Sequence, residues 1–407
     1  MTRLAVDFGT SNTSAAVPGF GIVPLERGAQ TMPTALFFDP ETKTVDFGTP
    51  AVDKLISGND GRFLRALKSV LGQPILRESR VLGGARTDLL NVIARFLAHV
   101  KARAEAETEL TFTEVLSGRP VRFHSRNASY NAQAERDLAE AYGIAGFTDV
   151  QFLPEPEAAA LACGGVDEGY GLVVDIGGGT SDYTVFRGTN SEIEVISSYG
   201  IRLGGTDFDR LLNIDRVMPS LGLGSMLRDE FGPGQNEAPR ALFHDLATWE
   251  KIPFQYTPQT LRNVQRMARQ ANDPKSWDRL VDVLEMELAH DIAHSVEKAK
   301  VSANGGPADG INMDVLRKGA RIPMAATDVA RVLQESAGEI GSAALNTVTE
   351  AGLAPDDIRR VVMVGGSSLM QVIETEIQRA LPNAEIDRSD AFTAIVDGLA
   401  IAAAKLS

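Results

Sequence analysis

The chain has 407 residues, of which 43% are hydrophobic and 23% charged, a composition typical of a globular protein with more than one core. Its formal net charge is −14 with no long basic run to offset it, which excludes nucleic acid and anionic membranes as main partners. Cys163 is the only cysteine, so an intrachain disulfide is excluded and a reducing compartment fits. We expect a cytoplasmic protein, because the opening residues MTRLAVDFG lack a signal-peptide pattern and no apolar run reaches the ~18 residues of a membrane helix.

The first predicted element is a strand–turn–strand unit at residues 4–17, LAVDFGTSNTSAAV, in which an apolar run ends at Asp7. The same pattern returns at residues 172–185, LVVDIGGGTSDYTV, and the two stretches align without a gap. Asp7 then falls on Asp175, and each following turn is rich in Gly, Ser and Thr. Two unrelated hairpins are the alternative, but the shared pattern favours a duplicated unit and two similar lobes, each offering one loop to a shared ligand.

Two helical segments are predicted between these units. Apolar residues at helical spacing over residues 63–71 predict an amphipathic helical segment that carries Lys68. Pro156 and the run EAAALA predict a helix that begins near Glu155. The ordinary interpretations of the two charged residues are a solvated lysine and an acidic helix start that the helix dipole favours.

Beyond the second unit, the chain holds a divergent stretch and a helix with regularly spaced polar residues. Residues 218–271 contain the polar Gly/Pro loop EFGPGQNEAPR and the helix-like run ALFHDLATWEKI. Glu297 and Lys300 are spaced i, i+3, so both can face one ligand or form a surface pair. His290 and His294 are spaced i, i+4, but without a third ligand we interpret them as surface histidines and not as a zinc site.

The two glycine-rich turns predict a phosphate site. Glycine lets backbone N–H groups approach phosphate oxygens, and the hydroxyls of Thr10, Ser11, Thr180 and Ser181 add donors. Since carboxylates do not bind phosphate directly, we interpret Asp7, Asp175 and Asp182 as outer ligands of a hydrated Mg²⁺, with a turn cap as the alternative for Asp182. The sequence contains no P-loop motif, and the second turn leads into a strand instead of the helix of a dinucleotide fingerprint.

These residues resemble a known superfamily. The paired hairpins look like the two phosphate loops of the actin, sugar-kinase and Hsp70 ATPase fold, and the finer resemblance is to the ATPase domain of the Hsp70 chaperones. It continues in family order through TMPTALFF, RALKSVLG, PEPEAAALACG, RLGGTDFDRLL, VEKAKVSA and VVMVGGSSLM. Within the family the chain is similar to the short YegD-type Hsp70-like proteins, which lack the peptide-binding domain. Actin-like filament proteins lack the LGGTDFD segment, and a sugar kinase needs a carbohydrate site that the sequence does not reveal.

The resemblance implies an α/β, two-lobed actin-like ATPase fold, with a mixed β-sheet flanked by helices in each lobe and the nucleotide in the central cleft. It implies lobe I at residues 1–168, lobe II at residues 169–387, and a C-terminal helix at residues 388–407 that returns toward lobe I. Residues 72–115 and 218–271 depart from the family pattern, and we expect a partner-specific surface there. No apolar linker or peptide-binding domain follows the last helix, so we expect no coupling of ATP state to peptide grip within this chain.

The resemblance also implies the site residues. Its catalytic residues are Lys68, Glu155, Asp175, Thr180 and Asp7, and Asp7 and Asp175 are the carboxylates on the metal side. Lys68 would reach the γ-phosphate or the attacking water, and Glu155, rather than Glu157, would orient water or metal. The nucleotide-binding residues are Gly9, Thr10, Ser11, Asn12, Gly177, Gly178, Gly179, Thr180, Gly204, Gly205, Thr206, Glu297, Lys300, Gly365, Gly366 and Ser367.

The adenine site departs from the family. Where Hsp70 chaperones usually carry two arginines that sandwich adenine, this chain has Val301 and Leu369, which predicts weaker ATP affinity or looser base selectivity. The expected function is a slow, Mg-ATP-binding Hsp70-like ATPase, chaperone-related, that switches lobe closure for a protein partner. A non-hydrolysing nucleotide sensor and a small-molecule phosphotransferase of the actin superfamily are the alternatives.

Overall fold

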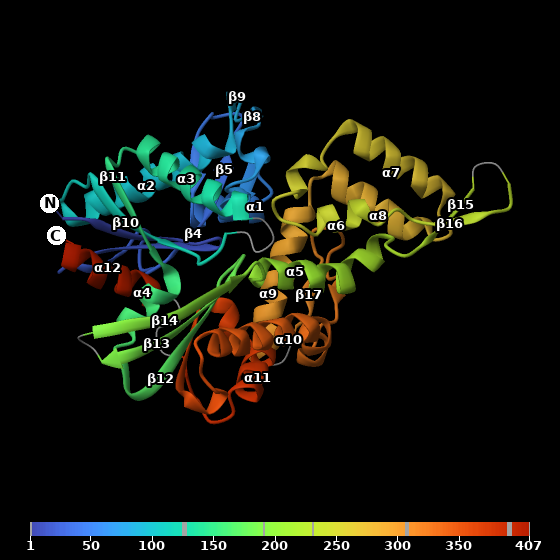
Figure 1. Ribbon diagram of the computed structural model, residues 1–407. Coiled ribbons are helices and arrows are strands. Elements are labelled where there is room, and N and C mark those ends of the chain that lie inside the picture. Colours follow the sequence, from blue (N-terminus) through green and yellow to red (C-terminus); the bar gives the residue numbers. More distant parts are fainter. Residues whose placement is uncertain are drawn as a thin grey trace. The chain divides into compact units, whose positions relative to one another are not determined.

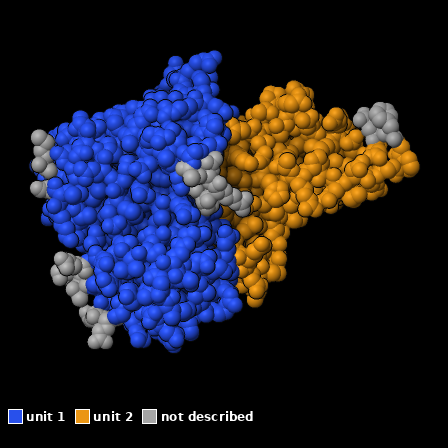
Figure 2. Space-filling view, viewed as in Figure 1, with its two compact units in different colours: residues 1–205, 337–407 blue, residues 206–336 orange. Residues whose placement is uncertain are grey.

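The computed structural model describes residues 2–123, 128–189, 192–229, 232–305, 309–388 and 393–406. The chain forms two compact units (Figure 2): unit 1 comprises Met1–Gly205 and Ala337–Ser407, and unit 2 comprises Thr206–Ser336. The lobes predicted from the sequence were drawn around the two duplicated hairpins, whereas the two units are defined by how the chain packs. The predicted lobe boundaries therefore stay a prediction. Within the described ranges, every helix is too short or too polar to cross a membrane.

Unit 1 contains two large mixed β-sheets (Figure 1). The first has the order β11-β10-β1-β2-β3, with β4 paired to β2, and the second has the order β14-β13-β12-β19-β20. The strands of the first sheet are β1 (Leu4–Phe8), β2 (Asn12–Val17), β3 (Gly21–Val23), β4 (Met32–Pro33), β10 (Glu114–Arg119) and β11 (Asp149–Pro154). Those of the second are β12 (Gly165–Ile176), β13 (Ser181–Thr189), β14 (Glu192–Ile201), β19 (Ile358–Val364) and β20 (Glu385–Asp387).

The two sheets repeat one topology. β1 pairs antiparallel with β2 so that Asp7 lies opposite Ser14, and β12 pairs antiparallel with β13 so that Asp175 lies opposite Asp182. On its other side each first strand has a parallel neighbour, β10 or β19, which itself pairs in parallel with β11 or β20. The second strand of each hairpin pairs antiparallel with β3 or β14. Both predicted strand–turn–strand units are therefore confirmed, in the same register that the sequence alignment gives.

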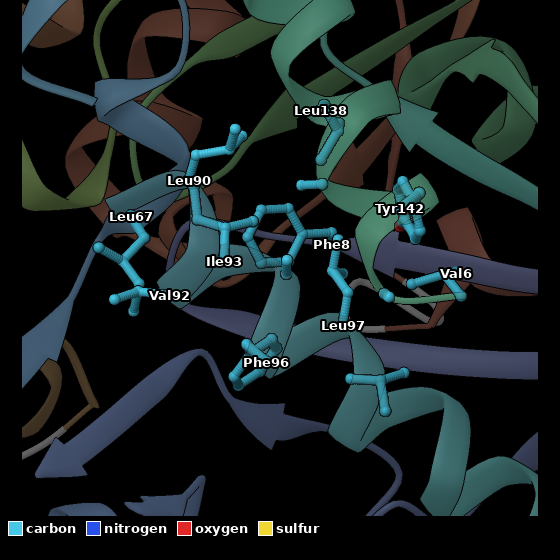
Figure 3. Packing of buried hydrophobic residues seen from close by; sticks show 14 of the residues in the cluster. Val6, Phe8, Leu67, Leu90, Val92, Ile93, Phe96, Leu97, Leu138 and Tyr142 are labelled. Carbon is cyan, nitrogen blue, oxygen red and sulfur yellow. The ribbon is translucent and has the colours of Figure 1, made fainter. Parts of the chain in front are cut away.

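One hydrophobic core of unit 1 lies against the first sheet and contains residues of α2 (Leu89–Thr108) and α3 (Ala128–Ile144). Phe8 of β1 packs on Phe96 of α2 with 5.9 Å between ring centroids, and Figure 3 shows Ile93 and Leu97 close by. These α2 residues recur every three or four positions, so the apolar stripe of the helix faces the sheet. The predicted α/β class, with mixed sheets flanked by helices, is confirmed.

Residues 35–87 of unit 1 form short strands and helices outside the two large sheets. A three-stranded sheet has the order β6-β5-β7, and β8 pairs with β9. Their bounds, with those of the nearby helices, are β5 (Ala35–Phe38), β6 (Val45–Phe47), α1 (Thr49–Ile56), β7 (Arg62–Arg65), η1 (Leu67–Val70), η2 (Pro74–Arg77), β8 (Arg80–Leu82) and β9 (Ala85–Thr87). The helix predicted over residues 63–71 is wrong: Phe63 pairs with Phe37 in a β-strand, Ala66 turns the chain at φ 58°, and η1 is only a short 3₁₀ turn. Leu64, Leu67 and Leu71 are three and four positions apart, which fits a helical pattern, but in the structure they belong to a strand and to the turn that follows it.

Helices α4 (Glu155–Ala162) and α12 (Ala394–Leu406) connect the two sheets of unit 1. Their alanines and leucines form one core with Ala5 and Leu116 of the first sheet and Val173 and Val362 of the second. The helices cross closely, because a Cβ added at Gly398 would overlap the carbonyl oxygen of Ala158. A glycine is therefore required at the crossing. Helices η7 (Gly366–Leu369) and α11 (Gln371–Ala380) lie between β19 and β20 in the chain, preceded by η6 (Pro355–Asp357).

Unit 2 is mostly helical. Its elements are α5 (Gly205–Leu212), η3 (Asn213–Val217), η4 (Met218–Leu221), β15 (Met226–Arg228), β16 (Gln235–Glu237), α6 (Ala241–Leu246), η5 (Ile252–Phe254), α7 (Pro258–Gln270), α8 (Pro274–Glu285), α9 (Ala289–Gly305), β17 (Ile311–Asn312), β18 (Arg321–Ile322) and the first part of α10 (Ala326–Glu350). The divergent stretch at residues 218–271 supplies the β15–β16 hairpin and α7; part of its polar loop, residues 230–231, lies outside the described residues. Trp277 of α8 is fully buried and meets Phe243 edge to face at 5.9 Å.

Candidate functional site

A buried ion pair lies beside the first sheet of unit 1. Lys68 Nζ lies 2.6 Å from Glu155 Oε1, and the two side chains are each only 7% exposed. Glu155 is the first residue of α4, directly after β11, and Pro156 suits that first turn because its missing N–H has no partner there to lose. Gly118 leaves room for the carboxylate, since a Cβ there would lie 3.1 Å from Glu155 Cγ. Glu155 and not Glu157 is thus the carboxylate that meets the lysine.

The turns of the two duplicated hairpins face each other. A Cβ added at Gly178 would lie 2.5 Å from Ser11 Oγ and 3.0 Å from Thr10 Cβ, and one at Gly179 would lie 3.2 Å from Thr10 Oγ1. Glycine at both positions lets the backbone of the second loop approach the opposite loop without a side chain between them. The structure therefore brings Thr10 and Ser11 of the first loop together with Gly178 and Gly179 of the second; Gly9 and Gly177 precede them in their own loops. Asn12, the first residue of β2, is exposed.

A threonine that the sequence reasoning did not single out fixes the first loop. The hydroxyl of Thr34 donates to the carbonyl of Gly9 at 2.9 Å, its backbone N–H donates to the carbonyl of Ser11 at 2.9 Å, and it contacts Thr13 Oγ1 at 2.8 Å. Thr34 is fully buried. In the sequence, Thr34 was visible only as part of the family-like segment TMPTALFF. Its role in holding the first loop was not predictable, because the loop residues that it contacts lie more than twenty positions away.

The other predicted glycines of unit 1 pack on the second loop. Gly205 donates its N–H to the carbonyl of Gly177 at 2.9 Å, and a Cβ on Gly204 would lie 2.7 Å from Gly179 N. Gly365 is at φ 80°, and a Cβ there would lie 2.9 Å from Asp175 Oδ1. A Cβ on Gly205 would overlap Ser367 Oγ, which places η7, with Gly366, beside the same loop. The chain from residue 203 to 205 and the end of β19 thus surround the turn after Asp175.

Four carboxylates gather near Lys68. Burial, then the charge of Glu155, raises the pKa of Asp7 to about 7, although Lys68 opposes the shift. Burial and the charges of Glu155, Asp182 and Asp7 hold the pKa of Asp175 well above its usual range. Burial lowers the pKa of Lys68, but the charges of Glu155, Asp7 and Asp175 and the hydrogen bond to Glu155 together outweigh it, so the net shift is upward. With all four carboxylates ionised the group would hold more negative charge than one lysine balances, and an added cation would stabilise that ionised state.

Asp182 plays a different part from the turn cap considered above. Its Oδ1 accepts from the N–H of Val121 at 2.7 Å, so the second hairpin is tied to the segment that follows β10 of the first sheet. Burial, followed by the charge of Glu155, raises the pKa of Asp182 to about 7, although hydrogen bonds from Thr180 and Val121 lower it. Its position opposite Asp175 in the hairpin was the available sequence signal.

The carboxylates suit a hydrated metal better than a bare one. Among the described residues, no three His, Cys, Asp or Glu side chains converge to hold an ion directly. Asp7 and Asp175 could still hold Mg²⁺ through its water ligands, because this ion keeps several waters and pairs with buried carboxylates at a distance. The excess of buried carboxylates is the observation that fits such an ion.

The remaining predicted nucleotide contacts belong to unit 2. Thr206 begins that unit, and Glu297 and Lys300 lie on α9. Lys300 is buried and its Nζ lies 2.7 Å from Asp209 Oδ1 of α5, so the lysine has an ionic partner within its own unit. Val301 is 65% exposed. The ribose role of Glu297 and Lys300 stays a prediction.

The histidines of α9 correct one expectation. His290 is buried, with its ring 5.4 Å from that of Trp249, so its predicted surface position is wrong. His294 is partly exposed, and its Nδ1 lies 3.7 Å from Glu297 Oε2. The i, i+4 spacing correctly indicates that both histidines lie on one face of α9, but it does not show whether that face is exposed. At His290 the face is buried against Trp249.

One comparison with known proteins bears on this site. Residues 78–217 match the family model described as Hsp70 protein. The match contains Glu155, the whole second hairpin and the RLGGTDFDRLL segment, whereas the first loop, Lys68 and α9 lie outside it. It also includes most of residues 72–115, which we expected to depart from the family. This segment, less than half of the chain, is therefore similar to the Hsp70 proteins, and it supports the resemblance to the Hsp70 and actin-like ATPase superfamily.

Proposed function

We propose that the protein binds Mg·ATP between its two hairpin loops, hydrolyses it slowly, and passes a nucleotide-dependent lobe closure to a protein partner in a chaperone-related role in the cytoplasm. The observation that carries this proposal is the pair of hairpins in equal register, with glycine loops in contact and the Lys68–Glu155 pair beside Asp7 and Asp175. The match to the Hsp70 family model supports nucleotide binding. The single cysteine and the absence of a disulfide are compatible with the cytoplasm.

Each group in the site has a chemical task in this proposal. Backbone N–H groups of the two glycine loops donate to phosphate oxygens, and the hydroxyls of Thr10 and Thr180 add to them. The Lys68 ammonium has three donors; one is directed to Glu155, and the others are available for a phosphate oxygen or the attacking water. Glu155 and Asp175 orient that water, and one of the two carboxylates accepts the proton that it loses. When bound, Mg²⁺ would neutralise charge on the phosphates.

The test compares two lysines of unit 1. Lys68→Met removes the site charge and keeps the volume, whereas Lys54→Met removes a lysine that pairs with Asp39 and Asp46 away from the site. Isothermal calorimetry with ATP and Mg²⁺, followed by phosphate release, should show binding and slow turnover in the wild type and in Lys54→Met. Turnover in Lys68→Met should fall by about 10²–10³. The proposal is contradicted if the wild type neither binds ATP nor releases phosphate faster than Lys68→Met.

A non-hydrolysing nucleotide sensor is the second candidate. Two observations favour it, because both weaken the expected contacts to the adenosine part of ATP. Val301 is exposed at the position where the family usually has an adenine-stacking arginine, and Lys300 is paired with Asp209. The sensor would bind ATP or ADP without turnover, and Glu155→Gln would leave binding unchanged. Turnover that depends on Glu155 would rule it out.

A further inference from the structure

The segment that carries Lys68 is a short turn with local hydrogen bonds, among them Ser69 Oγ to the carbonyl of Ala66 and Gln73 Nε2 to the carbonyl of Ser69, each at 2.7 Å. η1 is a single 3₁₀ turn between Ala66, at φ 58°, and Gly72, at φ 77°. Its backbone hydrogen bonds include Ser69 N–H to the carbonyl of Ala66 at 3.1 Å and a long one, at 3.4 Å, from Leu71 to Lys68. A turn of this kind is not stable in isolation. The position of the lysine therefore depends on contacts with other elements.

A carboxylate on a neighbouring helix provides such a contact. Asp137 of α3 is 1% exposed. Its Oδ2 accepts from the N–H of Gly72 at 2.9 Å, and its Oδ1 accepts from Arg77 Nη2 and from Gln133 Nε2, each at 2.7 Å. Both oxygens are thus engaged by donors, and two of the three donors belong to the chain that directly follows Lys68.

The backbone of Gly72 lies directly against α3. A Cβ on Gly72 would overlap the carbonyl oxygen of Tyr130 and lie 3.0 Å from Ala134 N. The side chains of Leu67, Val70 and Leu71 are buried in the core that α3 helps to form. The apolar contacts hold the segment on the helix, and the Asp137 hydrogen bonds set its position along it.

We propose that Asp137 is a positioning residue for Lys68, which it orients by fastening the end of η1 to α3. This inference rests on the proposed function, since Lys68 acts on phosphate or water there. Asp137 does not touch the lysine, so its effect passes through the backbone from Gly72 to Lys68. The negative carboxylate matters because all three of its partners donate hydrogen bonds; an asparagine would turn an N–H₂ group toward one of them.

The experiment compares Asp137→Asn with a matched control, Glu140→Gln. Glu140 lies one turn further along α3 and pairs with the same Arg77, but its side chain is 47% exposed and it does not contact Gly72. Steady-state ATP hydrolysis by the full chain should show kcat reduced about tenfold to a hundredfold in Asp137→Asn, because a small displacement of a catalytic group has effects of that size. KM for ATP should change by less than about twofold, since ground-state binding is retained. Glu140→Gln should behave as the wild type.

A second measurement separates positioning from loss of structure. Hydrogen exchange by mass spectrometry should be faster in Asp137→Asn over residues 66–73 and unchanged over the strands of the first sheet. Asp137→Glu, which keeps the charge, should recover part of kcat. The inference is overturned if Asp137→Asn keeps the kcat of an active wild type, or if exchange accelerates equally throughout unit 1. If the wild type has no turnover, the proposed function fails instead. In that case the anchoring role is still tested by hydrogen exchange, and it is overturned if exchange over residues 66–73 is the same in Asp137→Asn as in the wild type.

Discussion

Replacing Gly398 by alanine should destabilise the crossing of α4 and α12. The added Cβ would overlap the carbonyl oxygen of Ala158 and lie 2.9 Å from its Cα. These obstructing atoms are backbone, so no side-chain rotation relieves the overlap, and the helices must separate. Overpacking of a filled core costs about 1–3 kcal/mol, and the better helix propensity of alanine returns about 0.5–1 kcal/mol. The added Cβ would lie far inside contact distance of that backbone oxygen, so the upper end of the overpacking cost applies. We therefore expect a net loss of about 2 kcal/mol in the free energy of unfolding.

A second helical glycine provides the matched control. Gly338 lies inside α10, and a Cβ there would meet nothing within 4 Å. Gly338→Ala should therefore stabilise by about 0.5–1 kcal/mol through helix propensity alone. Urea unfolding followed by far-UV circular dichroism compares the two variants with the wild type. A midpoint for Gly398→Ala equal to or above that of the wild type would refute the steric reasoning. Because α4 begins at Glu155, the same variant should also lower ATP turnover.

Three further predictions concern buried polar groups. Lys300→Met should destabilise unit 2 by an amount on the order of 3 kcal/mol, since it removes the ammonium that lies 2.7 Å from Asp209 Oδ1 in a buried ion pair; thermal melting checks this, and a wild-type melting curve would contradict it. The pKa of Asp182 is raised from 3.8 to about 7 on folding, so its contribution to stability is present below about pH 4 and is lost as the pH rises through 7. Asp182→Asn should flatten that decline in the nucleotide-free protein by an amount on the order of 4 kcal/mol, and an unchanged pH profile of urea unfolding would show the assignment to be wrong. Tyr142→Phe removes a buried hydroxyl contact with Ser117 Oγ at 2.9 Å and should cost about 1 kcal/mol; a loss near zero in urea unfolding would show that the contact is not stabilising.

The parts of the fold that the sequence predicted correctly carry local signals. Each hairpin has two apolar runs around a glycine-rich turn, and its duplicate at a fixed offset strengthens the prediction. The start of α4 was predicted because Pro156 and a run of alanines lie next to one another. The segment around Lys68 was predicted wrongly because, over so few residues, the same apolar positions fit both a helix and a strand. The pairing of β7 with β5, which the local sequence does not show, makes it a strand.

The remaining parts of the site depend on partners that are distant in the sequence. The hydrogen bond between Asp182 and Val121 joins residues 61 positions apart, and that between Asp137 and Gly72 joins residues 65 apart. No local periodicity records such contacts. The burial of His290 depends in the same way on Trp249, which a helical spacing on α9 cannot reveal.

The duplicated hairpins are alike in backbone but not in chemistry. At one shared register position the first has the hydroxyl of Ser14 and the second has the carboxylate of Asp182. A receptor with two equal halves would accept a chain of phosphates in either direction. Here the two halves differ in charge at that position, and Lys68 pairs with Glu155, which follows the first sheet. A triphosphate bound as proposed would therefore have one preferred direction along the two loops.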